Sequence, residues 1–147
     1  MPTDLQLKAM NSAHRILLKL SGGRLGWNAL GMPVLELTTI GRRSGQPRSA
    51  MLTAPLVEGD TYVVVASRGG DDTHPAWFLN LRDEPRVDVV IKGGASQPRL
   101  ARVATPDERA RMWPLITSRY GNYAGYQKRT SREIPLVLLE PLPAPPA

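Results

Sequence analysis

The chain of 147 residues has no cysteine, two histidines and one phenylalanine. Without cysteine it cannot form a disulfide, a zinc ribbon, an iron–sulfur cluster or a thiol nucleophile. The histidines, His14 and His74, lie far apart in the sequence and belong to no metal-binding motif, so neither a metal site nor a Ser-His-Asp triad is expected. The sequence also lacks a Walker loop and a dinucleotide fingerprint. If the protein is an enzyme, we expect a bound cofactor to supply the reactive chemistry.

Long apolar runs are absent as well. No run approaches the roughly 18 residues that indicate a membrane span, and Lys8, Arg15 and Lys19 interrupt any signal-peptide core. We therefore expect a soluble protein of the cytoplasm. Lys and Arg number 19 against 13 Asp and Glu, which gives a net charge of +6. This excess favours an anionic partner: nucleic acid, an acidic membrane surface or a small molecule rich in phosphate or carboxylate.

The sequence indicates three stretches of different character. Residues 1–32 are expected to form an amphipathic helix, Thr3–Leu20, and a linker. Residues 33–141 are expected to form one β-rich domain, and residues 142–147 a proline-rich extended tail. The helix has apolar residues along one stripe and basic residues opposite. This pattern suits either packing on the domain or peripheral contact with an anionic membrane at the inner face of the cell.

Six segments have the patterns of short strands, at residues 34–40, 49–57, 61–67, 86–92, 99–104 and 134–140. Turn signals at Gly59-Asp60 and in residues 92–98 predict hairpins, and such spacing is typical of an antiparallel barrel or sandwich. Because its residues are almost all apolar, the last segment is expected to be a central strand.

Two helices interrupt these strands. The first is short and spans residues 75–81. The second begins at Thr105, where Glu108 completes a capping box, and Pro114 is expected to kink or end it.

Three segments are candidates for a cofactor site. Residues 41–48, GRRSGQPR, lie between two strand patterns and are expected to form a tight hairpin that carries three arginines. Gly41 and Gly45 allow close backbone approach. Residues 66–81, ASRGGDDTHPAWFLNL, combine an arginine, a glycine pair, an indole and an amide. In residues 120–126 three tyrosines recur every third position, which places them on one face of a helical turn. Considered alone, each has a structural alternative: a solvated basic turn, a core tryptophan and a structural aromatic cluster.

Together these segments resemble the deazaflavin-dependent nitroreductases, which use coenzyme F-420, an 8-hydroxy-5-deazaflavin. The stretch LTTIGRRSGQPR resembles the family's TTxGRKSGxxR loop, and residues 66–81 resemble its ASxGG…PxWxxNL segment. The tyrosines and the closing IPLVLLEP also fit, so that the resemblance covers roughly Pro33 to Pro141. It implies a mainly β fold with flanking helices, a split antiparallel β-barrel like that of oxidases that bind flavin mononucleotide.

The resemblance also implies an oxidoreductase that transfers a hydride from the reduced coenzyme to a quinone. Nitroaromatic compounds and unsaturated lactones would be accidental substrates. Arginine replaces the family's frequent lysine at Arg43 and Arg68, which keeps the charge but changes how oxygen atoms are held.

The family's site residues carry over to matching positions of this chain. Coenzyme contacts are implied for Arg42, Arg43, Ser44, Arg48, Ser49, Ala50, Met51, Leu52, Thr53, Val65, Ala66, Ser67, Arg68, Pro75, Ala76, Trp77, Phe78, Leu79, Asn80 and Tyr123. The phosphate and acidic tail of the coenzyme would lie against the first three, and the deazaflavin ring against the segments around residues 65–68 and 76–80. Catalytic roles at the acceptor are implied for Tyr120, Tyr123, Tyr126 and Ser67.

Two other functions explain part of the sequence. A basic nucleic-acid-binding barrel would account for the charge, but not for two arginine-bearing loops beside a Trp/Asn segment. A non-catalytic deazaflavin carrier or sensor would account for those loops but leave the tyrosines without a role. We therefore expect a small-molecule partner and no nucleic acid. The oligomeric state does not follow from the sequence.

Overall fold

The computed structural model describes residues 28–29 and 31–142. Eight strands of this part form one antiparallel sheet. They are β1 (Asn28–Ala29), β2 (Met32–Ile40), β3 (Pro47–Thr53), β4 (Leu56–Glu58), β5 (Thr61–Val65), β6 (Arg86–Ile91), β7 (Ser96–Val103) and β8 (Leu136–Pro141). The helical elements are the 3-10 turn η1 (Arg68–Gly70), α2 (Ala76–Asp83), α3 (Pro106–Arg119) and α4 (Gly121–Lys128).

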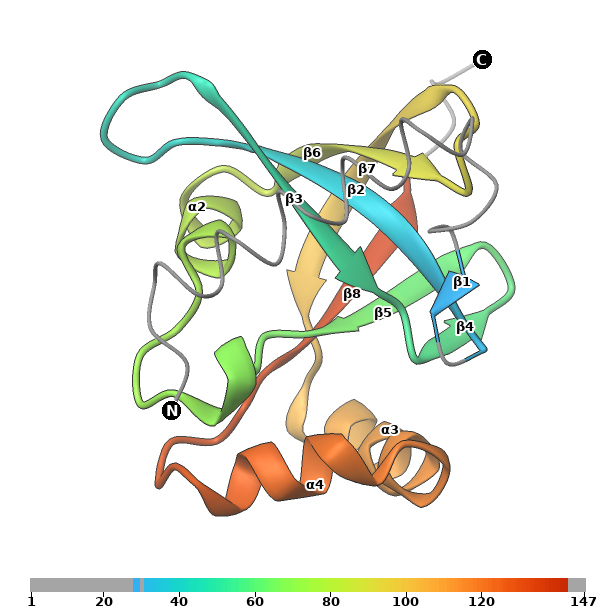
Figure 1. Cartoon of the computed structure of the whole chain (residues 1–147). Helices are drawn as coiled ribbons and strands as arrows, with labels where there is room; N and C mark the ends of the chain where they lie inside the picture. Colours follow the sequence, from blue (N-terminus) through green and yellow to red (C-terminus); the bar gives the residue numbers. More distant parts are fainter. Residues whose placement is uncertain (1–27, 30, 143–147) are drawn as a thin grey trace.

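The sheet is curled, and its strand order is β1-β2-β6-β7-β8-β5-β4, with β3 as a further partner of β2 (Figure 1). The β2–β3 hairpin is the longest, because its pairs run from Val34 and Thr53 to Ile40 and Pro47. In Figure 1 this hairpin projects beyond the sheet, with α2 beside it, whereas α3 and α4 lie together at the opposite end. This arrangement confirms the predicted mainly β fold with flanking helices.

The last strand, β8, is a central strand of the sheet, between β7 and β5, as the apolar run predicted, and it is buried on both faces. Its residues alternate between two clusters: Val137 and Leu139 belong to a core inside the curl with α2, and Leu136 and Leu138 to a core against α3 and α4. Strand β5 divides in the same way. Each face of these two neighbouring strands therefore carries a separate hydrophobic core, and β8 lies between them.

The predicted third helix, α3, begins as expected and continues further. Thr105 accepts a hydrogen bond from the Glu108 amide, and the Glu108 side chain accepts one from the Thr105 amide. An end at Pro114 was one of two expectations and is wrong, because α3 continues to Arg119. Pro114 and Ala110, whose carbonyl loses its helical partner, are both exposed, so water can satisfy that carbonyl.

The number of strands differs from the six that the sequence predicted. Residues 49–57 form two strands, because the chain changes partner around Pro55: β3 pairs with β2 and β4 pairs with β5. Proline has no amide hydrogen for a sheet ladder, which favours the break there. The short strand β1 was not predicted, since a pair of residues has no period to detect.

The predicted helix Thr3–Leu20 lies outside the described residues, as does nearly all of the proline-rich tail. Within residues 28–29 and 31–142, no helix is long and apolar enough to cross a membrane.

Candidate functional site

The basic loop between β2 and β3 is a tight and internally hydrogen-bonded turn. The Gly41 amide donates to the Gln46 carbonyl and the Gly45 amide donates to the Gly41 carbonyl, each with an N···O distance of 2.8 Å. The Ser44 hydroxyl accepts from the Gln46 amide at 3.2 Å. Gly45 has a φ of +69°, a conformation that favours glycine. The predicted hairpin is confirmed, and its local bonds hold the three arginines of this loop on a defined backbone.

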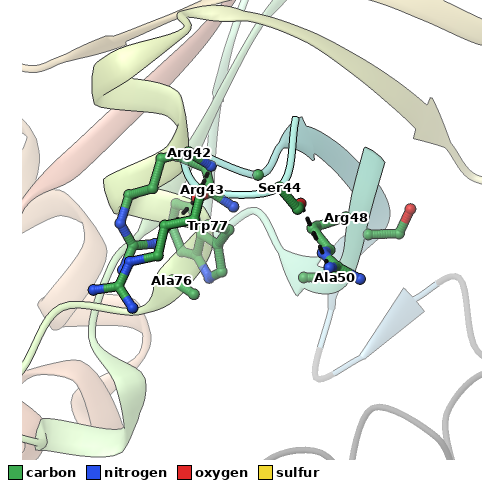
Figure 2. A pocket seen from close by; sticks show the side chains of 10 residues that line it. Arg42, Arg43, Ser44, Arg48, Ala50, Ala76 and Trp77 are labelled. Carbon is green, nitrogen blue, oxygen red and sulfur yellow. Dashed lines mark hydrogen bonds between the residues drawn. The ribbon is translucent and has the colours of Figure 1, made fainter. Parts of the chain in front are cut away.

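An open pocket of about 410 Å³ lies between this loop, the start of β3 and the first turns of α2 (Figure 2). It is lined by Gly41, Arg42, Arg43, Ser44, Arg48, Ser49, Ala50, Ala76, Trp77 and Asn80. All of these except Gly41 belong to the set that the sequence predicted. The pocket therefore brings together part of that set, from residues 42–50 and 76–80, which are about thirty positions apart in the chain.

The arginines of the pocket are exposed and have no acidic partner in the part of the chain that the structure describes. The salt bridges there involve other arginines, at positions 68, 102, 109 and 111. Among the described residues, Arg48 donates only to the Ser44 hydroxyl, at 3.5 Å. Guanidinium groups without a carboxylate partner keep their full positive potential for an anionic ligand.

Asn80 joins the loop to α2. Asn80 is buried, with 3% of its surface exposed. Its Oδ1 accepts from the amide of Arg42 at 3.2 Å and from Nη1 of Arg42 at 3.1 Å. Its Nδ2 donates to Oγ1 of Thr39 at 3.1 Å, and Thr39 is fully buried. Thr39 was not among the predicted site residues, although it lies in the stretch LTTIGRRSGQPR on which the resemblance rests.

The first part of the segment 66–81, which contains Arg68, does not line this pocket. Arg68 donates to the carboxylate of Asp71 at 2.6 Å and to the Thr73 hydroxyl at 2.9 Å. Hydrogen bonds from Thr73 hold the pKa of Asp71 below its usual value, and the charge of Arg68 acts in the same direction. Arg68 has a φ of +46°, an unusual conformation for a residue with a side chain. This arginine is thus turned toward its own loop.

Arg132 holds this loop in place and was not predicted. Its guanidinium donates to the carbonyls of Ala66, Ser67 and Asp71 over 2.8 to 3.2 Å, and contacts Nδ1 of His74 at 3.1 Å. Because a guanidinium only donates, Nδ1 of His74 accepts, and its proton is on Nε2. Burial and the charge of Arg132 lower the pKa of His74. Arg132 is 58 to 66 positions from the residues it contacts, so no local pattern reveals it.

The glycine pair of this segment allows a close contact with α4. Gly70 has a φ of +86°, and a Cβ there would lie 2.8 Å from the Tyr126 carbonyl oxygen and 3.1 Å from side-chain carbons of Arg129. Arg129 also donates to the Gly69 carbonyl at 3.4 Å. The glycines therefore set how the loop after β5 packs against the tyrosine-bearing helix.

Two of the three tyrosines are buried. Tyr120 and Tyr123 are 8% and 6% exposed and belong to the core between the sheet and α3–α4, and Tyr126 is half-buried against it. The rings of Tyr123 and Tyr126 pack edge to face, with their centroids 6.0 Å apart. The Tyr123 hydroxyl lies 3.0 Å from Thr53 Oγ1 and donates to the sulfur of Met32. Burial raises the pKa of Tyr123.

The other predicted residues lie behind or beside the pocket. Thr53 at the end of β3 is the point where Tyr123 meets this strand. Ser67 is 9% exposed, and its hydroxyl has no hydrogen-bond partner within the described residues. The remainder are wholly or partly buried, most of them in the core inside the curl: Met51, Leu52, Val65, Ala66, Pro75, Phe78 and Leu79.

Comparison of the structure with solved structures defines the class of fold. A putative pyridoxamine 5'-phosphate oxidase from Listeria innocua superposes with a TM-score of 0.51 at 16% identity, over 86% of this chain and 90% of that chain. Such a distant likeness concerns the fold alone. It confirms the predicted split β-barrel.

Sequence similarity then gives the family. The model of the family described as F420H(2)-dependent quinone reductase matches residues 11–141, and the chain belongs to this family. The F420H(2)-dependent quinone reductase Rv1261c of Mycobacterium tuberculosis is 36% identical over 133 residues, which are 86% of each chain. A solved structure of an F420-H2 dependent reductase, FDR-A, has 38% identity and a TM-score of 0.64, over 74% of this chain and 94% of that chain.

Proposed function

We propose that this protein is an oxidoreductase that transfers a hydride from reduced coenzyme F-420 to a quinone, with the coenzyme bound between the β2–β3 loop and α2. The observation that carries this proposal is the convergence of Arg42, Arg43 and Arg48 on one pocket that Trp77 also lines. Membership of the quinone reductase family supports the reaction class.

The donors of the pocket fit the anionic part of this coenzyme. Its phosphate and its glutamate carboxylates are planar or tetrahedral oxygen groups, which guanidinium forks bind through charge-assisted hydrogen bonds. The turn that carries Arg42 and Arg43 is held by its own backbone bonds. Little backbone conformational entropy is therefore lost when an anion binds there.

The rest of the pocket fits a flat ring. Trp77 offers an aromatic surface, and Ala50 and Ala76 are small enough to leave space beside it. The reduced deazaflavin, when bound, supplies the hydride. We propose that residues on β3 (48–53), after β5 (65–68) and on α2 (75–80) orient the ring and keep water from one of its faces.

We propose that the acceptor lies on the α4 side of β3. Tyr123 touches Thr53 on the same strand that lines the pocket with Ser49 and Ala50, which supports this position. Of Tyr120, Tyr123 and Tyr126, Tyr126 is the most exposed and is the best candidate to contact the acceptor oxygen. Tyr120 and Tyr123 would support it from the core. The Ser67 hydroxyl is available for a further hydrogen bond to a ligand.

Titration of the purified protein with oxidised coenzyme F-420, followed by the fluorescence of the coenzyme, tests the binding step. We expect tighter binding than for flavin mononucleotide and a preference that shrinks with added salt, because the coenzyme tail carries more negative charge. Equal or tighter binding of the flavin would contradict the proposal. Stopped-flow oxidation of the reduced coenzyme by a water-soluble quinone then tests the reaction, and binding without acceleration would indicate a carrier.

We also propose a peripheral membrane partner, on the evidence of the sequence of residues 3–20. That segment combines an apolar stripe with Lys8, Arg15 and Lys19. Deletion of residues 1–20 is expected to abolish co-sedimentation with vesicles that contain anionic lipid, while coenzyme binding is retained. Loss of folding on deletion would instead show that the segment stabilises the domain.

A further inference from the structure

We infer that Asn80 is a positioning residue that fixes Arg42 for an anionic group without neutralising it. This inference rests on the proposed function, because the anion in question is that of coenzyme F-420. It differs from the direct coenzyme contact that the resemblance implies for Asn80. In this inference the side-chain amide of Asn80 binds Arg42 in the β2–β3 loop and does not bind the coenzyme.

The hydrogen bonds of Asn80 carry the inference. Its Oδ1 accepts from both the backbone amide and Nη1 of Arg42, so one oxygen fixes the start of the loop and the direction of the guanidinium. Its Nδ2 donates to Thr39 on β2. At 3% exposure, the Asn80 side chain is largely used within the protein. Arg42 has five N–H donors, and this contact occupies one of them.

The chemistry of the amide explains why asparagine is used here. An aspartate at this position could accept the same two hydrogen bonds from Arg42. It would also add a negative charge about 3 Å from the guanidinium, and a carboxylate at that distance would compete with the ligand for it. A neutral amide oxygen orients Arg42 and leaves its charge available.

Two variants of Asn80 separate orientation from charge. Asn80→Asp keeps the acceptor for Arg42, and the Thr39 hydroxyl can rotate to donate to the new carboxylate. We expect coenzyme binding to weaken by about 10- to 150-fold, the loss expected when one charge-assisted hydrogen bond to an anion is removed. We also expect binding to depend less on salt than in the wild type. Asn80→Ala should weaken binding less, by roughly 3- to 10-fold, with the salt dependence retained.

Asn122→Asp is the matched control, because it makes the same change of net charge at an exposed position on α4 that does not line the pocket. Its coenzyme affinity is expected to stay close to that of the wild type. If the Asn80→Asp variant does not fold, a double-mutant cycle replaces it. Asn80→Ala should then have no further effect on coenzyme binding once Arg42 is alanine.

The experiment is fluorescence titration with coenzyme F-420 at about 0.05 and 0.5 M salt, together with amide hydrogen exchange of the coenzyme-free protein. Exchange at Arg42 should accelerate in Asn80→Ala and stay slow in Asn80→Asp. The inference would be overturned if Asn80→Asp bound the coenzyme like the wild type, or if all variants showed the same salt dependence. It would also be overturned by additive effects in the double-mutant cycle, or by unchanged exchange of the Arg42 amide in Asn80→Ala. If the wild type does not bind the coenzyme, the proposed function itself fails, which is a distinguishable result.

Discussion

The two ends of this molecule use arginine in opposite ways. At the β2–β3 end, Arg42, Arg43 and Arg48 are exposed around a pocket, with no carboxylate partner in the described part of the chain. At the helical end, Arg102 pairs with two glutamates and Arg111 with a third, over distances of 2.7 Å. The same side chain thus connects elements at one end and is available to a ligand at the other.

The pKa values of the glutamates that pair with arginine reflect this difference. Arg102 and the capping contact with Thr105 lower the pKa of Glu108 to about 2. Arg111 likewise lowers the pKa of Glu58. At the pocket end, the excess of positive charge has no such local compensation among the described residues. The comparison teaches that the arginines to test for ligand binding are those whose counter-charge the protein does not supply.

The largest expected effect tests the helical end as structure. Tyr123→Ala removes a ring that is 6% exposed and leaves a cavity between the sheet and α4. We expect the free energy of unfolding to fall by about 3–5 kcal/mol, measured by urea denaturation. Tyr123→Phe keeps the ring and should cost only about 1 kcal/mol. An alanine variant as stable as the wild type would show that this ring is not part of the core.

The next effect tests the contact between the loop after β5 and α4. Gly70→Ala places a Cβ 2.8 Å from the Tyr126 carbonyl, in a left-handed conformation. The free energy of unfolding should fall by about 2–4 kcal/mol, from backbone strain and crowding together. Gly45→Ala is the control, because Gly45 also has a positive φ but a Cβ added there would have no atom within 4 Å. It should cost about 1–2 kcal/mol, and equal losses would mean that the close contact is unimportant.

Loss of a pocket arginine should affect binding and not folding. Arg43→Ala is expected to weaken coenzyme binding by about 1.5–3 kcal/mol, roughly 10- to 150-fold, as measured by fluorescence titration. Arg43→Lys should lose less because the charge remains. Arg111→Ala removes an exposed ion pair at the other end and should leave binding unchanged. If Arg43→Ala binds like the wild type, the comparison between the two ends fails.

A smaller effect is expected for the hydroxyl of Tyr126. Tyr126→Phe should leave coenzyme affinity unchanged and reduce the rate of quinone reduction by about 2- to 12-fold, the value of one neutral hydrogen bond in the transition state. Stopped-flow oxidation of the reduced coenzyme measures that rate. Tyr120→Phe is the comparison at a buried position. An unchanged rate in Tyr126→Phe would place the acceptor elsewhere.

The smallest effect concerns acid stability. Glu108 has a pKa of about 2 in the folded protein, below the usual 4.5, so its contribution to stability is complete above about pH 4.5 and is lost as the pH falls toward 2. The contribution is modest because Arg102 is 39% exposed and solvent screens the pair. Urea denaturation between about pH 6 and pH 3 should show a shallower decline for Glu108→Gln. Parallel curves would rule out this ion pair as a source of the pH dependence.

The sequence by itself determined the features that depend on neighbours along the chain. Gly41 and Gly45 between two strand patterns predicted the basic hairpin, and Thr105 with Glu108 predicted the start of α3. The apolar run at residues 134–140 predicted a central strand, which is β8. These features need only local backbone preferences and hydrophobic periodicity, which can be read within a few residues.

The tertiary structure alone decided which candidate side chains face a common site. Arg68 has the same charge as Arg43, yet it pairs with Asp71 and lies away from the pocket. Arg132 and Thr39 act on residues about sixty and forty positions away, and the three tyrosines divide between core and surface. Such outcomes depend on how distant segments pack, because burial and hydrogen-bond partners are properties of the assembled fold and not of any short stretch of sequence.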